Sequence, residues 1–235
     1  MALDDYLKPW LGEVPVYRPG EMVPGCVKLA SNENNYGPSP KVIECLKAKA
    51  SQVNVYPYRD GELRQAIAGY AGVSEDQVAC GNGSDELMEQ LFKAFNGGAL
   101  GFHPSFSQYR NYAKIFGRDY LSLDLEQDFE FDLESFIKAS KNAEILFLCS
   151  PNNPTGGAIG LDDVEAVADT GKIVVVDEAY HEFHGETAVG LIESHPNLMV
   201  LRTFAKAFAL AGLRVGYALA NPKVVEALDT VRSPF

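Results

Sequence analysis

Two short, continuous apolar runs constrain the fold of this chain more than any other feature. They are Ile145–Cys149 and Ile173–Val176, and residues that favour turns bound each of them. Apolar runs of this length without alternation are typical of parallel strands buried on both faces of a sheet. Because such strands need helices on both sides, the pattern predicts an α/β fold, a three-layer α/β/α domain with a mainly parallel sheet.

The rest of the chain alternates between helical and strand patterns from about Ser39 onward. Helices are expected to begin at Ser39-Pro40, to span Gly61–Tyr70, to begin at Ser84 as N-cap residue, and to run from Asn221-Pro222 to about Val231. Further strands are expected at Val78–Cys80, Leu198–Leu201 and Val215–Leu219. Residues 1–35 carry four prolines and are predicted to form an irregular arm or part of a smaller domain, whereas residues 36–235 form the main domain.

The composition of the chain argues against several kinds of binding partner. The net charge of −12 argues against nucleic acid and anionic membranes, because both would repel this surface. No apolar stretch approaches the ~18 residues of a membrane span, and the N-terminus resembles no secretory signal. The four cysteines lie in or near apolar segments without a C-x-x-C pair, which favours reduced core thiols and a cytoplasmic protein. His181 and His184 have a spacing that metal ligands use, but no third ligand accompanies them, so no metal site is predicted.

Five polar side chains follow the apolar runs of the second half. They are Asn153, Asp177, Tyr180, Lys206 and Arg214. The ligand crevice of a parallel α/β sheet lies at the carboxyl ends of its strands, so these side chains are expected to converge on one edge. An amide, a carboxylate, a phenol, an amine and a guanidinium together suit pyridoxal 5′-phosphate (PLP).

Lys206 is the strongest candidate for a reactive group. It stands between Phe204 and Phe208, where burial of a charged amine is costly. Desolvation lowers the pKa of an amine, and the neutral amine is the form that attacks an aldehyde. The alternative for Lys206 alone is a loop lysine that reaches water, and the alternative for Asp177 is a turn or N-cap aspartate.

Several longer segments carry a family resemblance. They are Lys28-Leu-Ala-Ser-Asn-Glu33, Gly37-Pro-Ser-Pro40, Tyr56-Pro-Tyr-Arg-Asp-Gly61, Gly81-Asn-Gly-Ser-Asp-Glu86 and Leu201-Arg-Thr-Phe-Ala-Lys206-Ala-Phe-Ala-Leu-Ala-Gly-Leu-Arg214. These segments resemble the histidinol-phosphate aminotransferases, which belong to the fold-type-I PLP-dependent enzymes. The resemblance runs nearly from end to end.

The resemblance implies a role for each candidate residue. Lys206 would hold the cofactor through a Schiff base and then move the proton between the substrate and the cofactor. Asp177 would pair with the pyridinium nitrogen, Tyr180 and Asn153 would donate to the ring oxygen, and Phe106 would stack on the ring. Ser84, Asp85, Thr203 and Arg214 would hold the phosphate, joined by Tyr56 of a partner subunit in a homodimer. Tyr17 and Asn34 would approach the substrate.

The implied reaction is amino transfer between glutamate and imidazole acetol phosphate, with 2-oxoglutarate and histidinol phosphate as the products, in histidine biosynthesis. Four features depart from the family pattern: Ala205 replaces a serine, Asn96–Phe102 is shorter, Asn35-Tyr36 stands in place of a Pro-Leu pair, and the chain stops before a C-terminal small domain. That domain carries the arginine that grips the substrate. We therefore expect the isolated chain to bind PLP weakly and to transaminate poorly.

Two alternatives stay open at this point. The same lysine, aspartate and arginine serve aromatic-amino-acid aminotransferases and threonine-phosphate decarboxylases, because a fold does not fix a reaction. The chain could instead be a non-catalytic, truncated PLP-fold module, which Ala205 and the missing domain favour. The intact Lys206, Asp177, Tyr180 and Arg214 argue against that second alternative.

Overall fold

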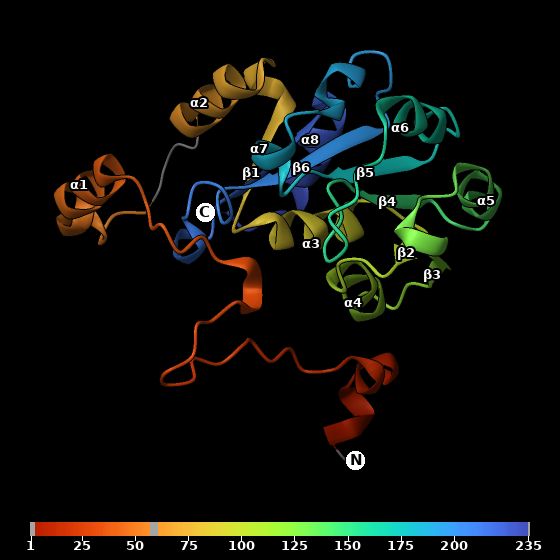
Figure 1. Ribbon diagram of the computed structural model, residues 1–235, viewed down its shortest axis with the longest axis horizontal. Coiled ribbons are helices and arrows are strands. Elements are labelled where there is room, and N and C mark those ends of the chain that lie inside the picture. Colours follow the sequence, from red (N-terminus) through yellow and green to blue (C-terminus); the bar gives the residue numbers. More distant parts are fainter. Residues whose placement is uncertain (1–2, 57–60, 235) are drawn as a thin grey trace.

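The core of the molecule is a twisted sheet of seven strands. The computed structural model describes residues 3–56 and 61–234, and within this part the strand order is β1-β7-β6-β5-β4-β2-β3 (Figure 1). The strands are β1 (Val78–Gly81), β2 (Ala99–His103), β3 (Tyr120–Asp124), β4 (Ile145–Cys149), β5 (Ile173–Asp177), β6 (Leu198–Thr203) and β7 (Gly216–Ala220). β7 runs antiparallel to β6 and β1, and the other four pairs are parallel. The predicted mainly parallel sheet is therefore confirmed.

Helices cover both faces of this sheet, as a three-layer α/β/α architecture requires. The helices are α1 (Pro40–Lys49), α2 (Gly61–Ala71), α3 (Ser84–Ala94), α4 (Gln108–Ile115), α5 (Leu133–Ala139), α6 (Leu161–Ala168), α7 (His181–His184) and α8 (Pro222–Val231). α3 packs against α4 and α8 on one face, and α5 packs against α6 on the other (Figure 1).

The central strands are apolar because they are enclosed on both sides. All five residues of β4 are buried, and four of the five in β5 are buried. The register pairs Cys149 with Asp177 and Asp177 with Leu201, so the carboxyl ends of β4, β5 and β6 lie side by side. This alignment positions the candidate site.

Helix α3 carries the expected apolar face. Leu87, Met88 and Leu91 are fully buried on the sheet side of the helix. The predicted N-cap is wrong by one residue: Gly83 occupies that position with φ +82°, and Ser84 is the first helical residue. A left-handed backbone favours glycine there, and serine in the first turn keeps its backbone N–H exposed.

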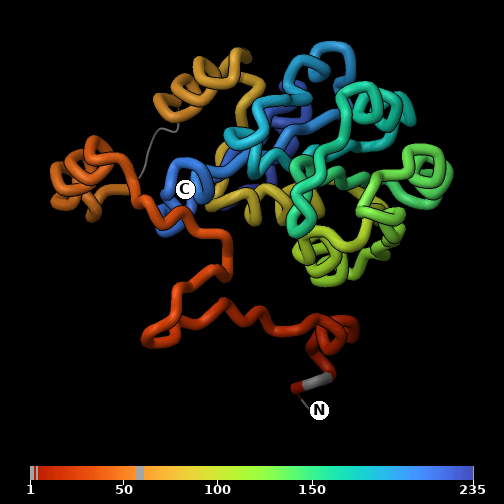
Figure 2. Tube along the Cα trace, in the orientation of Figure 1, coloured from red at the N-terminus to blue at the C-terminus, as the bar shows by residue number. Residues whose placement is uncertain are grey.

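The N-terminal part of the chain packs differently from the rest. Among the described residues up to Tyr56, no side chain is buried, and Figure 2 shows this stretch as an extended path outside the sheet. α1 begins with Ser39 at the N-cap and Pro40 in the first turn, as predicted. Its apolar residues Ile43 and Leu46 are nevertheless 39% and 45% exposed, because nothing in the described chain covers them.

Two further observations bear on the compositional predictions. Cys149 is buried, but Cys26 and Cys45 are exposed, so the prediction of core thiols is wrong for these two. Both lie in the loosely packed N-terminal part, where apolar neighbours in sequence do not become a core. Among the described residues, no helix has the length and apolar content needed to cross a membrane.

A buried ion pair stands beneath the edge of the sheet that carries the site. Glu178 and Arg202 are 2% and 3% exposed, and the guanidinium donates to Glu178 Oε2 at 2.8 and 3.0 Å. Thr187 Oγ1 donates to the same oxygen, and the Ala188 N–H donates to Oε1. Every oxygen of the carboxylate is therefore used, which fixes the residue next to Asp177.

Substitution Glu178→Gln should lower the free energy of unfolding by about 3–5 kcal/mol, because it leaves the Arg202 charge buried without a counter-ion. Urea unfolding followed by circular dichroism measures the change. The matched control is Glu89→Gln, which breaks the exposed Lys93–Glu89 pair and should cost about 0.5 kcal/mol or less. Equal changes in the free energy of unfolding for the two substitutions would show that the buried ion pair contributes no more to stability than the exposed one.

Candidate active site

One cavity gathers most of the predicted site residues. Its volume is about 110 Å³, and it lies where β4, β5 and β6 end and where α3 begins. The lining residues include Ser84, Asp85, Phe106, Asn153, Asp177, Tyr180, Thr203, Lys206 and Arg214. Cys149 and Ala205 complete the wall together with Ala179. Side chains that are up to 130 residues apart in sequence thus converge at the predicted sheet edge.

Asp177 is a buried carboxylate without a cation beside it. It is 3% exposed, Tyr109 Oη donates to Oδ2 at 2.7 Å, and the Ala179 N–H donates to Oδ1 at 3.1 Å. No ion pair with Asp177 occurs among the described residues. Burial raises the pKa of this carboxyl, and the two hydrogen bonds oppose that shift. Such a group is suited to a ligand that brings its own positive N–H.

Lys206 extends from the loop after β6 toward the N-terminal segment. Its Nζ donates to the Ser31 carbonyl at 2.7 Å and lies 5.8 Å from the centre of the Tyr180 ring. Burial lowers the pKa of the amine, while Asp85, Glu33 and Asp177 act in the opposite direction. The amine therefore loses its proton more readily than an ordinary lysine.

We expect the reductive methylation of Lys206 in the cofactor-free protein to have a pH midpoint below the ~10.4 of an ordinary lysine. Peptide mass spectrometry across a pH series measures the extent of labelling, with the exposed lysines as reagent controls. Glu33→Gln removes one of the charges that hold the proton, so it should move the midpoint further down. A midpoint at or above the ordinary value would contradict the desolvation argument.

The end of the cavity at the start of α3 is formed by backbone N–H groups and a guanidinium. The first turn of α3 leaves the N–H groups of Ser84 and Asp85 without carbonyl partners from a preceding turn. Arg214 Nη2 lies 3.0 Å from Asp85 Oδ2, so an arriving anion shares this guanidinium with the carboxylate. The hydroxyl of Thr203 lines the cavity but already bonds to backbone, accepting from the Ala205 N–H at 3.1 Å.

Two glycines allow this end of the cavity to close. A Cβ on Gly216 of β7 would lie 2.3 Å from the Ser84 backbone nitrogen, so only glycine lets the strand approach the start of α3. A Cβ on Gly83 would lie 2.4 Å from Arg214 Nη2. Side chains at either position would fill the space in which an anion meets the helix and the guanidinium.

The other wall carries hydrogen-bond donors and an aromatic ring. Asn153 and Tyr180 line both the cavity and an adjoining open space of about 370 Å³. Asn152 anchors the loop that carries Asn153, because its side chain bonds to Ser105, to Thr155 and to the Pro104 carbonyl. Phe106 contributes its ring from the loop before α4.

The structure does not bring all of the predicted residues together. Tyr56 is 71% exposed and Tyr17 is 67% exposed, and neither lines the cavity. Asn34 lies close by, since its Nδ2 donates to the Ala207 carbonyl at 3.0 Å, next to Lys206. The predicted partner-subunit contact of Tyr56 stays a prediction, and part of its motif, residues 57–60, falls outside the described residues.

Three contributors to the site were missed from the sequence. Tyr109 holds Asp177, Asn32 Nδ2 donates to the Tyr180 hydroxyl at 2.7 Å, and the Ser31 carbonyl receives Lys206. The only available signal for Tyr109 was its place three residues after Phe106, at helical spacing. Ser31 and Asn32 have φ of 69° and 50°, a backbone turn that the sequence did not indicate.

The histidine pair makes ordinary contacts. His181 Nδ1 lies 2.9 Å from the Glu186 carbonyl, and His184 Nε2 lies 3.4 Å from the Glu186 carboxylate. Throughout the described residues, no group of three or more His, Cys, Asp or Glu side chains is arranged to hold a metal ion.

The residues present fit PLP. The buried, cation-free Asp177 matches a protonated ring nitrogen, and the α3 start with Arg214 matches a phosphate. The space kept open by Gly83 and Gly216 is the space that such a phosphate needs. Lys206, with its lowered pKa, is the only lysine that lines the cavity within the described part.

Comparisons with known proteins agree with this arrangement. Residues 24–235 match the family described as aminotransferase class I and II. This chain belongs to that family. It is 40% identical to the histidinol-phosphate aminotransferase of Desulfitobacterium hafniense, over 100% of this chain and 68% of that protein. It is 42% identical to the enzyme of the same name from Thermoanaerobacter pseudethanolicus, over 91% of this chain and 63% of that protein.

Solved structures are similar as well. The histidinol-phosphate aminotransferase from Sinorhizobium meliloti in complex with pyridoxal-5′-phosphate superposes with a TM-score of 0.86 at 27% identity, over 97% of this chain and 66% of that one. An L-threonine-O-3-phosphate decarboxylase from Porphyromonas gingivalis, 24% identical with a TM-score of 0.72, shares the fold. The chain spans about two thirds of the length of these relatives.

Proposed function

We propose that this chain provides the PLP-binding and proton-transfer part of a histidinol-phosphate aminotransferase. The observation that carries the proposal is the convergence of Lys206, Asp177, Tyr180, Asn153 and Arg214 on one cavity at the carboxyl ends of the strands. The reaction is amino transfer between glutamate and imidazole acetol phosphate, with 2-oxoglutarate and histidinol phosphate on the other side. The 40% identity to relatives of that name supports this substrate pair over others.

PLP, when bound, supplies an aldehyde carbon for attachment of an amine and a protonated ring that accepts electrons. Lys206 is the amine of this chain that would hold the cofactor, and its Nζ would carry the proton that moves during the transfer. Asp177 keeps the ring nitrogen protonated. Arg214 and the start of α3 hold the phosphate, and the Tyr180 hydroxyl and the Asn153 amide orient the ring oxygen.

The N-terminal loop shapes the substrate side of this cavity. Asn32 donates to the Tyr180 hydroxyl and Asn34 bonds beside Lys206, so residues 31–34 lie next to the groups that a substrate would meet. Asn34 is therefore the better supported of the two substrate residues suggested by the resemblance. Tyr17 lies on the exposed arm, outside this loop.

A homodimer is part of the proposal. The described residues 16–56 expose Val16, Val27, Leu29, Val53 and Tyr56 by more than half, and α1 has no buried residue. Exposed apolar surface of this extent marks an interface, and a second copy of the chain would cover it and bring Tyr56 to the phosphate. The cytoplasmic location expected from the sequence stays a prediction.

Borohydride reduction of the PLP-incubated protein tests the proposal most directly. We expect a single pyridoxyl group on Lys206 in the peptide map, and single-turnover transfer from histidinol phosphate faster than from phenylalanine. A preference for phenylalanine would assign the site to an aromatic aminotransferase, and release of carbon dioxide from threonine phosphate would assign it to a decarboxylase. Absent or scattered labelling would support the non-catalytic alternative.

A further inference from the structure

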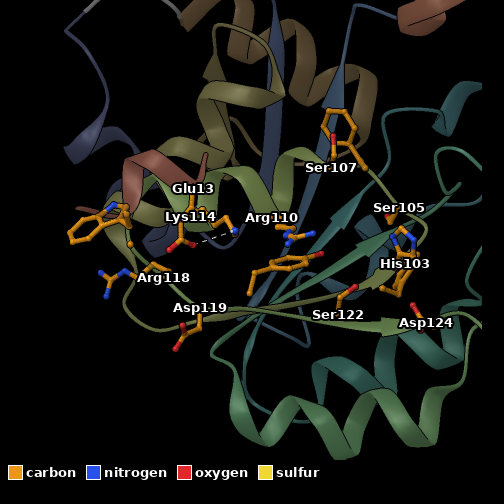
Figure 3. A pocket seen from close by; sticks show the side chains of 15 residues that line it. Glu13, His103, Ser105, Ser107, Arg110, Lys114, Arg118, Asp119, Ser122 and Asp124 are labelled. Carbon is orange, nitrogen blue, oxygen red and sulfur yellow. Dashed lines mark ion pairs between the residues drawn. The ribbon is translucent and has the colours of Figure 1, made fainter. Parts of the chain in front are cut away.

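A second large cavity lies outside the candidate active site. Its volume is about 790 Å³, within the about 300–1,000 Å³ of typical small-molecule sites. It is bounded by the short helix η2 (Pro9–Glu13), by α4, by β3 and by the loop before α4 (Figure 3). Nothing in the proposed amino transfer uses it. We refer to it as the α4 pocket.

Two cations stand on one face of α4 and line this pocket. Arg110 and Lys114 are four residues apart, so their side chains project from the same side of the helix, as Figure 3 shows. Arg110 has no hydrogen bond and no carboxylate within 4.0 Å among the described residues. Within residues 3–56 and 61–234, the carboxylate near Lys114 is that of Glu13, at 3.7 Å, and it is 75% exposed.

A third cation lies just beyond the end of the helix. Among the described residues, the Arg118 side chain donates one hydrogen bond, to Asn96 Oδ1 at 3.5 Å, and its Nε is buried without a partner. A chain with 32 acidic and 20 basic residues would ordinarily pair such guanidiniums. Three poorly compensated cations in one concave site attract an anion.

Three carboxylates line the pocket: Glu13 faces Lys114, and Asp119 and Asp124 lie apart from each other. Asp119 directly precedes β3 and Asp124 ends it, so the length of the strand separates them by roughly 16 Å. Figure 3 shows them at opposite ends of the pocket, with Arg110 between them. Arg110 is therefore a cation of the pocket that is left without a carboxylate partner among the described residues.

Aromatic rings also line the pocket. Trp10 contributes an indole that is 37% exposed, and its Nε1 donates to the Ile115 carbonyl at 3.1 Å. It is seated there because Gly117 has no side chain: a Cβ at that position would lie 2.7 Å from the indole. Tyr120 and Phe106 line the pocket as well. Flat apolar surfaces beside cations favour a ligand that combines a ring with an anionic group.

From this arrangement we infer that the α4 pocket binds a small aromatic or heteroaromatic molecule that carries a phosphate group. The phosphate takes the bidentate guanidinium of Arg110 and the charge of Lys114, and the ring packs against Trp10. A phosphate suits two cations at this spacing better than a carboxylate, because it offers three acceptor oxygens and up to two charges. The site is separate from the cofactor cavity, although Phe106 lines both.

Trp10 makes the test simple, because it is the only tryptophan of the chain. The cofactor-free protein is titrated with adenosine 5′-monophosphate at constant ionic strength, and the indole emission is recorded. We expect a saturable change, with tighter binding than for adenosine or for inorganic phosphate. Arg110→Gln and Lys114→Gln should each weaken binding at least about tenfold.

Two control variants make the outcome decisive. Lys93→Gln removes an exposed cation of α3 that does not line the pocket, and Arg214→Gln removes the guanidinium of the cofactor cavity. Both should leave the titration unchanged. Loss of the response in Arg214→Gln, or equal binding by Arg110→Gln and the parent protein, would overturn the inference, as would a response that never saturates. Because PLP is absent, none of these results depends on the proposed amino transfer.

Discussion

Substitution Lys206→Ala is expected to abolish amino transfer, with a loss of at least about 10⁴-fold in the single-turnover rate. The substitution removes the group that attaches to the cofactor and the group that moves the proton at the same time. The fold should survive, because the amine makes one hydrogen bond, to the Ser31 carbonyl, and its side chain is only partly buried. The rate is measured with histidinol phosphate and PLP-saturated protein.

Two controls separate chemistry from folding for this substitution. Lys206→Arg keeps the positive charge and the length but provides no amine, so it should be as inactive as the alanine variant. Lys93→Ala, on the exposed face of α3, should keep the parent rate. Covalent pyridoxyl label in the Lys206→Ala protein at the level of the parent would assign the attachment to another lysine, and the assignment of the site would then be wrong.

The sheet and most of the site could be predicted because burial leaves a strong pattern in sequence. Strands enclosed on both faces must be apolar throughout, so β4 and β5 were found with nearly the observed boundaries. A charged or polar residue at the end of such a strand is costly unless it has a function. That cost is why Asp177 and Lys206 stood out, and why their convergence followed from the parallel topology.

The parts that could not be predicted depend on contacts between distant segments. Tyr109 looks like one more aromatic core residue until the fold places its hydroxyl 2.7 Å from Asp177. The left-handed turn at Ser31 and Asn32 contains no glycine, so the local sequence does not predict it. The apolar face of α1 has the helical spacing of a packed helix, yet no described residue of this chain covers it. Periodicity indicates that a face is apolar, but not what will pack on it.

Substitution Asp177→Asn is expected to lower the rate of amino transfer and to raise the stability of the cofactor-free protein. Asparagine has the same shape and can keep both contacts, with its oxygen accepting from the Ala179 N–H and its amide donating to the Tyr109 oxygen. It cannot hold a protonated ring nitrogen through a negative charge, so the single-turnover rate should fall at least about 100-fold. The cofactor-free protein should at the same time become more stable at neutral pH, by roughly 0.5–2 kcal/mol.

The sign of the stability change follows from the pKa of the carboxyl. Burial raises the pKa of Asp177 above its value of about 3.9 in the unfolded chain. Between these two pKa values the folded state binds more protons, so stability falls as the pH rises through this window. The variant with a neutral asparagine does not lose stability over this pH window. Its advantage over the parent should therefore be absent below the window and fully developed above it.

Thermal and urea unfolding of the cofactor-free proteins across a pH series measures this difference. The matched control is Asp162→Asn, an exposed aspartate in the first turn of α6 whose charge favours the helix N-terminus. That substitution should lower stability slightly, by about 0.3–1 kcal/mol, which is the opposite sign. Lower stability of Asp177→Asn at neutral pH would mean that the buried carboxylate is compensated in the folded chain without a ligand. The argument that Asp177 is held ready for a cationic ring nitrogen would then fail.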